Sequence, residues 1–199
     1  MEYYPWLKDD EDDAFAWIDV TPKSLMDKEY RLKIGAPAKD WFPTDTTYEL
    51  CKDRGVKLTD SIPNNLRLLF VSERLKTLLE KEAASTAIEF LPVRLKNQRK
   101  QFVDKPYYIA NVLDCVSCME REKSDFVMDS LVKDQVFRFR RLVLDEGRLP
   151  EDKKLFRLGE KKDLFIIRED LAQAILNADM NGMMFIPMED YGADFRART

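Results

Sequence analysis

Hydrophobic and polar positions follow the same order in two segments of the chain, residues 69–93 and 164–188. Each segment opens with an apolar run, continues with apolar residues at helical spacing among charged ones, and closes with a second apolar run that contains a proline. Short apolar runs rich in β-branched and aromatic residues predict strands, and apolar residues every three to four positions predict an amphipathic helix. The pattern therefore predicts a strand–helix–strand unit that occurs twice, although short apolar patterns also resemble one another by chance.

The two predicted helices each carry one apolar face. Its members are Leu75, Leu78, Leu79 and Ala83 in the first copy, and Leu171, Ala174, Ile175 and Ala178 in the second. Ser72 is a predicted N-cap of the first helix, because a serine hydroxyl accepts a hydrogen bond from an unpaired N–H of the first turn. Gly182 is the predicted stop after the second helix.

Further elements are predicted around the two copies. They are strands at 3–7, 14–20, 107–113, 136–144 and 155–158, a helix at 46–54, and a turn at 145–147, with the strand at 107–113 forming a hairpin with 88–95. Because hairpins and single helices are mixed and do not alternate strictly, the sequence predicts an α+β fold with mixed or antiparallel sheets. No linker rich in glycine, serine or proline divides the chain, so we expect one domain over 1–199, with an irregular region at 1–65 and a duplicated core at 66–190.

Composition narrows the class of protein. A content of 45% hydrophobic and 35% charged residues is typical of a globular protein, and no apolar run approaches the 18 residues of a membrane span. The first residues have neither the basic nor the apolar region of a signal peptide. Three cysteines are a sparse and odd set, typical of reduced thiols. We therefore expect a cytoplasmic protein.

The residue types give little support for an enzyme. The chain has no histidine, which excludes Ser–His and Cys–His nucleophile pairs, and its six glycines are too scattered for a phosphate-binding loop. Cys115 and Cys118 have the spacing of half a zinc site, but a second ligand pair is missing. Paired carboxylates at 145–146 and 151–152 would need a pocket and a raised pKa to act as a hydrolase. We predict no catalytic residues, no metal and no cofactor, and keep a carboxylate-dependent hydrolase as a remote alternative.

The net negative charge of the chain is confined to its first twenty residues. They contain seven acidic residues and one lysine, a net charge of −6, whereas the other 179 residues carry 30 acidic and 32 basic side chains. Charge steers protein association and aromatic side chains anchor it, so an acidic run near tryptophans suits a basic protein surface. The predicted partner-binding residues are Asp9, Asp10, Glu11, Asp12 and Asp13, with Trp6, Trp17 and Trp41 as anchors.

Other interpretations of the charged segments stay open. The acidic run is also typical of a solvated loop between two strands, with the aromatic side chains packed inward. Calcium binding is a third interpretation, but the run lacks EF-hand spacing and a loop glycine. A basic cluster, consisting of Arg94, Lys96, Arg99 and Lys100 and followed by Phe102, suggests a nucleic-acid-binding module as an alternative function. The same cluster is typical of the solvated tip of a hairpin.

Five strings in order carry a resemblance to a known family. They are IEFLPVRL at 88–95, YYIANVLDCV at 107–116, RRLVLD at 140–145, LFRL at 155–158, and the second copy of the repeat at 164–188. This order resembles the bacterial immunity-protein family of polymorphic toxin systems (Imm-eleven type), first described as a domain of unknown function. The resemblance covers roughly residues 66–190. It departs at Arg168, where the family more often has a serine or aspartate helix cap.

The resemblance implies a protein–protein inhibitor. We expect an immunity protein that binds its cognate toxin effector and neutralises it stoichiometrically, by occluding the active site or by preventing a required rearrangement. The resemblance further suggests a nuclease delivered by type VI secretion or by cell contact, for which an acidic run would imitate the phosphate backbone. No catalytic residue, membrane contact or direct nucleic-acid contact is implied.

Overall fold

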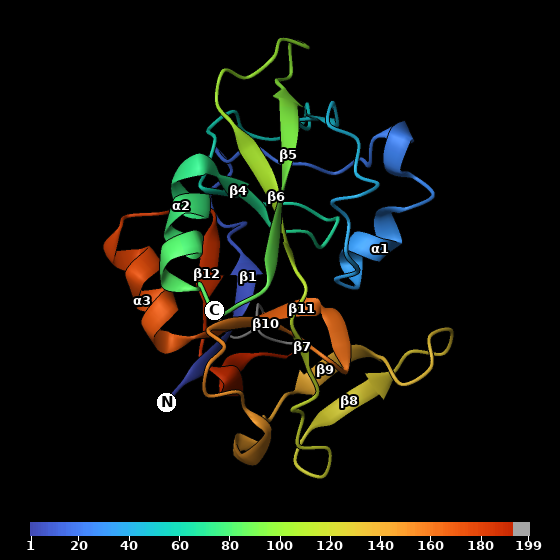
Figure 1. The fold of residues 1–199 in the computed structure, drawn as a ribbon, viewed down its shortest axis with the longest axis vertical. Coiled ribbons are helices and arrows are strands. Elements are labelled where there is room, and N and C mark those ends of the chain that lie inside the picture. The colour runs from blue at the N-terminus through green and yellow to red at the C-terminus, as the bar shows by residue number, and fades with distance from the viewer. Residues whose placement is uncertain (193–199) are drawn as a thin grey trace.

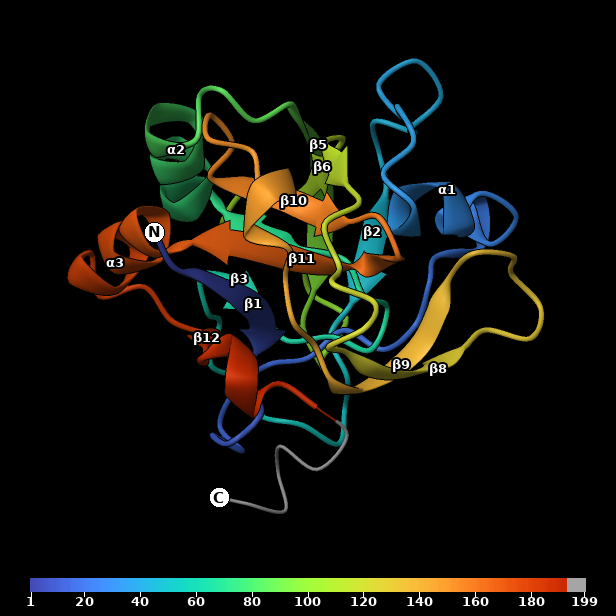
Figure 2. The same cartoon turned by 90° about the horizontal axis from the view of Figure 1, so that it is seen from below.

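Two five-stranded sheets, a separate two-stranded hairpin and three α-helices make up the computed structural model, which describes residues 1–192 (Figures 1 and 2). The mixture of helices with antiparallel and mixed sheets confirms the predicted α+β class. The last seven residues of the predicted 1–199 domain lie outside the described residues. No helix in the described part of the chain has the length and apolar character needed to cross a membrane.

The first sheet has the strand order β2-β5-β6-β4-β3. Its strands are β2 (Thr47–Glu49), β3 (Ser61–Ile62), β4 (Phe70–Ser72), β5 (Ile88–Lys96) and β6 (Tyr107–Val112). Helix α2 (Glu73–Glu82) connects β4 to β5, and the short helix α1 (Glu29–Lys33) belongs to the irregular segment that precedes the sheet.

The second sheet has the order β12-β1-β11-β10-β7. Its strands are β1 (Tyr3–Lys8), β7 (Cys115–Val116), β10 (Leu155–Leu158), β11 (Lys161–Arg168) and β12 (Met183–Phe185), and α3 (Glu169–Asn177) connects β11 to β12. The separate hairpin consists of β8 (Asp125–Met128) and β9 (Val136–Arg141). Three single turns of 3-10 helix complete the elements: Lys23–Leu25, Glu146–Arg148 and Met188–Asp190.

The repeat seen in the sequence is a repeat of structure. In each copy, two strands that a helix connects lie on either side of a third strand and run antiparallel to it. In the first copy the central strand is β6, which follows the unit in the chain. In the second copy it is β1, which comes from the N-terminus. Helices α2 and α3 lie side by side at one edge of the molecule (Figure 1).

The two helix starts differ as their sequences predict. The Ser72 hydroxyl accepts a hydrogen bond from the Leu75 N–H at 3.2 Å, which confirms the predicted cap. Arg168 holds the equivalent position before α3 and makes no side-chain cap. Its guanidinium instead donates to the Asp170 carboxylate at 2.7 and 2.9 Å. The second helix therefore starts with an ion pair in place of a hydroxyl cap.

Gly182 does not end the second helix, as the sequence predicted, but has a different role. Helix α3 already ends at Asn177, five residues before it. Gly182 has a φ of +87°, and a Cβ built on it would lie 1.9 Å from the Ser61 carbonyl oxygen. The glycine therefore allows the turn before β12 to lie directly against β3, which brings the edges of the two sheets together.

The largest difference from the sequence predictions lies in the N-terminal region. The helix predicted at 46–54 is wrong, because this segment contains β2, which pairs in parallel with β5. Tyr48 and Leu50 are buried while Glu49 is exposed, which is the two-residue period of a strand. The strand predicted at 14–20 is reduced to isolated bridges at Phe15 and Ile18. The predicted hairpin of 88–95 with 107–113 and the strand at 155–158 are confirmed.

Both sheets use their two faces to bury apolar side chains. Along β11, Phe165 and Ile167 join a central cluster that includes α2 and α3, whereas Leu164 and Ile166 join a cluster beneath the β8–β9 hairpin. Phe70 and Val71 of β4 divide in the same way between an N-terminal cluster and the central one. Fully burying a large apolar side chain contributes about 1.5–3 kcal/mol. The apolar packing in this central cluster is therefore the main contact between the two copies of the repeat.

A buried arginine adds a polar connection between the same parts. The Arg157 side chain is 1% exposed, and its five N–H groups point at five acceptors. These are the carbonyl oxygens of Val112 (2.7 Å), Leu32 (2.8 Å), Lys33 (2.9 Å) and Lys162 (2.8 Å), and the side-chain oxygen of Asn111 (3.4 Å). Burial lowers the pKa of Arg157 to about 10, so the side chain stays charged at neutral pH.

Asn111 extends this connection to a buried carboxylate. Its amide donates to the Ala36 carbonyl oxygen and to the Glu89 carboxylate, each at 3.0 Å. Glu89 also accepts the Ala38 N–H at 2.7 Å. The network joins α1 and the following loop to β5 and β6 of one sheet and to β10 of the other. The prediction from the sequence that residues 1–199 form a single domain stays a prediction.

Replacing Arg157 by methionine should destabilise the protein by at least about 3 kcal/mol, because several buried carbonyl oxygens would lose their donor. Urea unfolding followed by tryptophan fluorescence measures the loss. Arg138→Met is the matched control, since Arg138 is exposed, and it should change the free energy of unfolding by less than about 0.5 kcal/mol. Equal effects of the two substitutions would contradict the structural role of Arg157.

Candidate functional site

The acidic run forms a short ordered loop at the end of β1, which we call the acidic loop (residues 9–13). The Asp9 carboxylate accepts the Glu11 N–H at 3.2 Å, and the Asp12 carboxylate accepts the Ala14 N–H at 2.9 Å. The Asp9 N–H donates to the Gly182 carbonyl oxygen at 3.3 Å. Glu11 and Asp13 are exposed. Two carboxylates therefore hold the turns of the loop, while others face solvent.

Two of the predicted aromatic anchors lie inside the protein. Trp6 and Trp17 are only 5% and 3% exposed. The Trp6 ring packs edge-on against Phe185 at 5.4 Å between ring centroids. The Trp17 ring lies between the Lys8 ammonium at 4.4 Å and the Arg54 guanidinium at 4.5 Å. These two rings therefore pack inward, as the alternative interpretation expected, and support the acidic loop from within the fold.

Trp41 lies in another part of the molecule. It is half-buried after α1, where its indole N–H donates to the Pro37 carbonyl oxygen at 2.8 Å. Lys28 and Arg31 lie over its ring at 5.6 and 5.0 Å. The structure records no hydrogen bond or ring contact between Trp41 and the acidic loop in residues 1–192. The eight predicted partner-binding residues therefore do not form one surface.

Basic groups compensate part of the charge of the acidic loop. Lys57 lies 3.6 Å from the Asp12 carboxylate, and Lys8 donates to the Asn65 side chain at 2.7 Å. Asn65 in turn donates to the Asp19 carboxylate at 2.8 Å. The loop itself has five acidic residues in succession, so an excess of negative charge remains on this surface.

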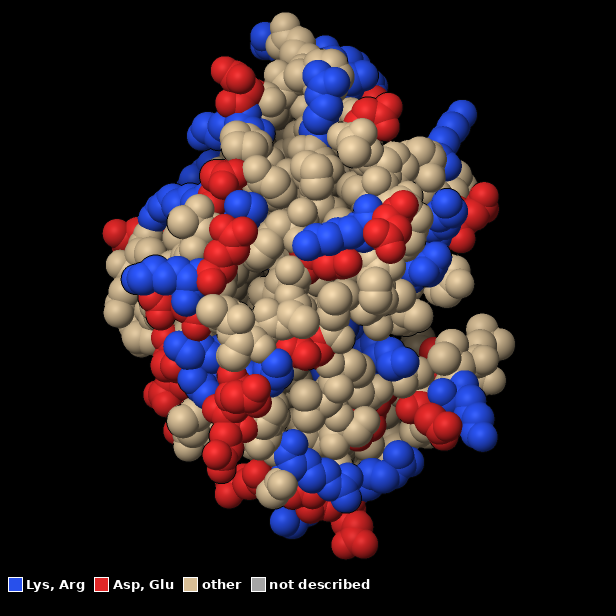
Figure 3. All heavy atoms as spheres, viewed as in Figure 1, with Lys and Arg blue, Asp and Glu red and all other residues tan. Residues whose placement is uncertain are grey.

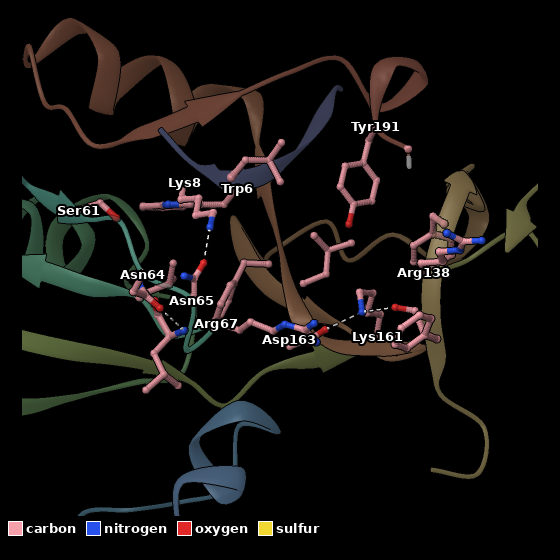
Figure 4. A pocket seen from close by; sticks show the side chains of 18 of the residues that line it. Trp6, Lys8, Ser61, Asn64, Asn65, Arg67, Arg138, Lys161, Asp163 and Tyr191 are labelled. Carbon is pink, nitrogen blue, oxygen red and sulfur yellow. Dashed lines mark hydrogen bonds and ion pairs between the residues drawn. The ribbon is translucent and has the colours of Figure 1, made fainter. Parts of the chain in front are cut away.

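A cavity of about 620 Å³ opens beside the base of the acidic loop (Figure 4). Its walls come from the end of β1, the segment before β4, strand β9 and strand β11. The sequence did not predict this cavity, because its polar residues lie far apart in the chain. They are Lys8, Ser61, Asn64, Asn65, Arg67, Arg138, Lys161, Asp163 and Tyr191.

An ion triad lies along one wall of the cavity. The Asp163 carboxylate pairs with Arg67 and, at 3.2 Å, with Lys161. Lys161 also donates to the Phe137 carbonyl oxygen at 2.9 Å, which ties β11 to the hairpin. Burial would raise the pKa of Asp163, but the two cations outweigh burial and lower it. The lowered pKa keeps the Asp163 carboxylate charged at neutral pH, where it is paired with both cations.

The remaining chemical candidates have structural partners. Asp145 accepts the Gly147 N–H at 3.0 Å and pairs with Arg148 at 3.0 Å, so it caps a turn. Cys115 is exposed and Cys118 is buried, both are free thiols, and burial raises the pKa of the Cys118 thiol. No cluster of three or more metal-ligating side chains exists in the part of the chain that the structure describes.

The basic cluster forms the tip of the β5–β6 hairpin. Arg94 and Lys96 lie over the Phe102 ring at 3.6 and 5.0 Å, and Lys100 pairs with Glu49. Nucleic-acid-binding proteins use such rings to stack bases. Here two cations of the same chain already occupy the ring, so the geometry gives this alternative no added support.

Comparison with known proteins assigns the family. The immunity protein family (Imm11) matches residues 14–190, which is most of the chain, and the chain belongs to this family. No curated protein sequence matches the chain. Membership gives the chain the role of an immunity protein, for which the partner is a toxin, and suggests an inhibitor that is not an enzyme. The matched residues begin directly after the acidic loop, so the family assignment is independent of that loop.

The ion triad makes a prediction about acid stability. Because the folded pKa of Asp163 is lowered, its contribution to stability is present above the unfolded aspartate pKa of about 4 and is lost as pH falls through the folded value. Asp163→Asn should therefore be less stable than the wild type at pH 7, and the difference should shrink below pH 4. Urea unfolding at a series of pH values measures this. A difference that is constant with pH would contradict the charged triad.

Proposed function

We propose that the protein protects its producer from a toxin with a basic functional surface, and that the acidic loop faces this surface. The observation that carries the proposal is the exposed, ordered acidic loop beside a polar cavity in a member of an immunity protein family. Ordered carboxylates need little reorganisation on binding, which favours fast and tight association.

The proposed mechanism is stoichiometric occlusion in the cytoplasm. A nuclease has a basic surface that holds the phosphate backbone, and carboxylates in succession supply charge of the same sign as the phosphates. We therefore propose a nuclease as the toxin, delivered by type VI secretion or by cell contact. Occlusion needs no catalytic group in the immunity protein, and the chemistry of the cavity is in keeping with this.

We expect a toxin gene beside the gene of this protein, and the toxin domain that it encodes gives the direct test. Mixed with purified immunity protein, it should form a one-to-one complex in analytical ultracentrifugation. Its cleavage of DNA or RNA should fall in proportion to the immunity protein added. If the toxin domain binds but has no nuclease activity, the proposal that the toxin is a nuclease is contradicted, whereas the proposed immunity function is retained. Absence of binding would contradict the proposed function.

Reversing the exposed charge of the acidic loop should weaken toxin binding. In the double variant Glu11→Lys and Asp13→Lys, the two exposed carboxylates are reversed and the turn-forming carboxylates of Asp9 and Asp12 are kept. We expect about a 100-fold higher Kd, about 2.7 kcal/mol, together with a slower and less salt-dependent association rate. Surface plasmon resonance at several salt concentrations measures both.

A matched variant distinguishes the effect of the position of the charge on toxin binding from the effect of the net charge. Glu122→Lys and Asp152→Lys change the net charge equally at exposed positions outside the loop. This variant should retain toxin affinity within about threefold, and both variants should keep the wild-type Tm within a few degrees. If the two variants bind equally, net charge alone acts and the acidic loop has no special role.

A further inference from the structure

A group of large apolar side chains is exposed between α1 and the β8–β9 hairpin. Leu131 is 92% exposed, Tyr30 62%, Phe137 57%, Val132 53% and Ile34 43%. Four of these, all except Leu131, line one cleft of about 480 Å³. Single exposed apolar residues are ordinary, but several around one cleft are typical of a protein interaction site.

The cleft is visible on the molecular surface. Figure 3 shows the surface hollowed between the segments that Figure 1 labels α1 and β8, with the tip of the hairpin projecting beside the hollow. The cleft shares Arg67, Phe137, Lys161 and Asp163 with the cavity beside the acidic loop. The ion triad therefore stands between the two, and both belong to one extended concave surface.

The hairpin tip that carries Leu131 and Val132 has a defined conformation. The Asp129 carboxylate accepts the N–H groups of both residues, at 2.8 and 3.0 Å, and these hydrogen bonds lower its pKa. The Gln135 side chain donates to the Gly159 carbonyl oxygen at 2.9 Å, which fastens the tip to the turn between β10 and β11. The apolar side chains are thus presented to solvent by an ordered loop.

The charge around the cleft has the opposite sign to that of the acidic loop. Its lining contains five basic residues, Lys33, Arg67, Lys133, Lys161 and Lys162, and two acidic ones, Asp129 and Asp163. Asp163 is already paired within the triad, and Asp129 holds the hairpin turn. Lys133 and Lys162 form no ion pair within residues 1–192. An apolar cleft with positive charge at its rim complements an acidic segment that carries apolar side chains.

We propose that this cleft, lined by Tyr30, Ile34, Val132 and Phe137 with Lys133 and Lys162 at its rim, is a second docking site on the immunity protein, and that it takes an acidic segment of the toxin bearing apolar anchors. The proposal rests on the proposed function, because its occupant is the same toxin. Two docking sites of opposite charge on one concave surface fix the orientation of the partner. A basic toxin surface at the acidic loop and an acidic toxin segment in the cleft bind in one orientation only.

Variants of the cleft test the proposal with the toxin domain encoded by the neighbouring gene. Val132→Ser with Phe137→Thr removes apolar contacts, and Lys133→Glu with Lys162→Glu reverses the rim charge. Each pair should raise the Kd at least about 20-fold, the apolar pair mainly through faster dissociation and the charge pair mainly through slower association. Phe102→Thr with Leu176→Gln is the matched control, since both side chains are about half exposed elsewhere, and it should leave the Kd unchanged.

The occupant is identified by photocrosslinking. Val132→p-benzoylphenylalanine should crosslink to the toxin domain at a segment with an excess of aspartate and glutamate, as read by mass spectrometry. A crosslink to a basic segment, or between two copies of the immunity protein, would overturn the proposed occupant. Tight binding of the wild type with equal affinity of both cleft variants would overturn the cleft alone. Absence of wild-type binding would overturn the proposed function together with the cleft.

Discussion

The five N–H groups of Arg157 must all find acceptors, because a guanidinium buried without partners would cost more than the fold can supply. Its acceptors come from the end of α1, from β6 and from the start of β11. Gly35, at a φ of +71°, leaves the room that the side chain needs, since a Cβ there would lie 2.7 Å from its Nε. The hydrogen bonds of this one side chain therefore fix the position of the two sheets and of α1 relative to one another. The shape of the cleft between α1 and the hairpin depends on the same hydrogen bonds.

The duplicated unit explains why the two proposed binding surfaces lie at the edges of the molecule. Each copy uses its helix and one sheet face to build the central cluster, so the residues of the repeat are occupied with packing. The surfaces with unusual charge or exposed apolar side chains belong to segments outside the two copies: the acidic loop, α1 and the β8–β9 hairpin. Such segments change at little cost to the core, which suits a protein whose surface must match a partner.

Local pattern predicted the elements that are locally specified. The serine cap at Ser72, the strand at 155–158 and the β5–β6 hairpin follow from residues close in the chain. The segment at 46–54 contains residues that favour either a helix or a strand, and its pairing with β5 decided for the strand. The inward packing of Trp6 and Trp17 was equally open in the sequence, because an aromatic residue beside charged ones suits a core edge as well as an interface.

The sequence by itself determined the class of fold, the repeat, the family and the concentration of negative charge at the N-terminus, since periodicity and composition are properties of neighbouring residues. Only the tertiary structure decided that β1 completes the second copy of the repeat, that Arg67, Lys161 and Asp163 meet in one triad, and that Tyr30 and Val132 line one cleft. Arg67 and Asp163 are 96 positions apart in the chain, Tyr30 and Val132 are 102 apart, and β1 and β11 are more than 150 apart. Their meeting depends on how two sheets pack, which no local pattern encodes.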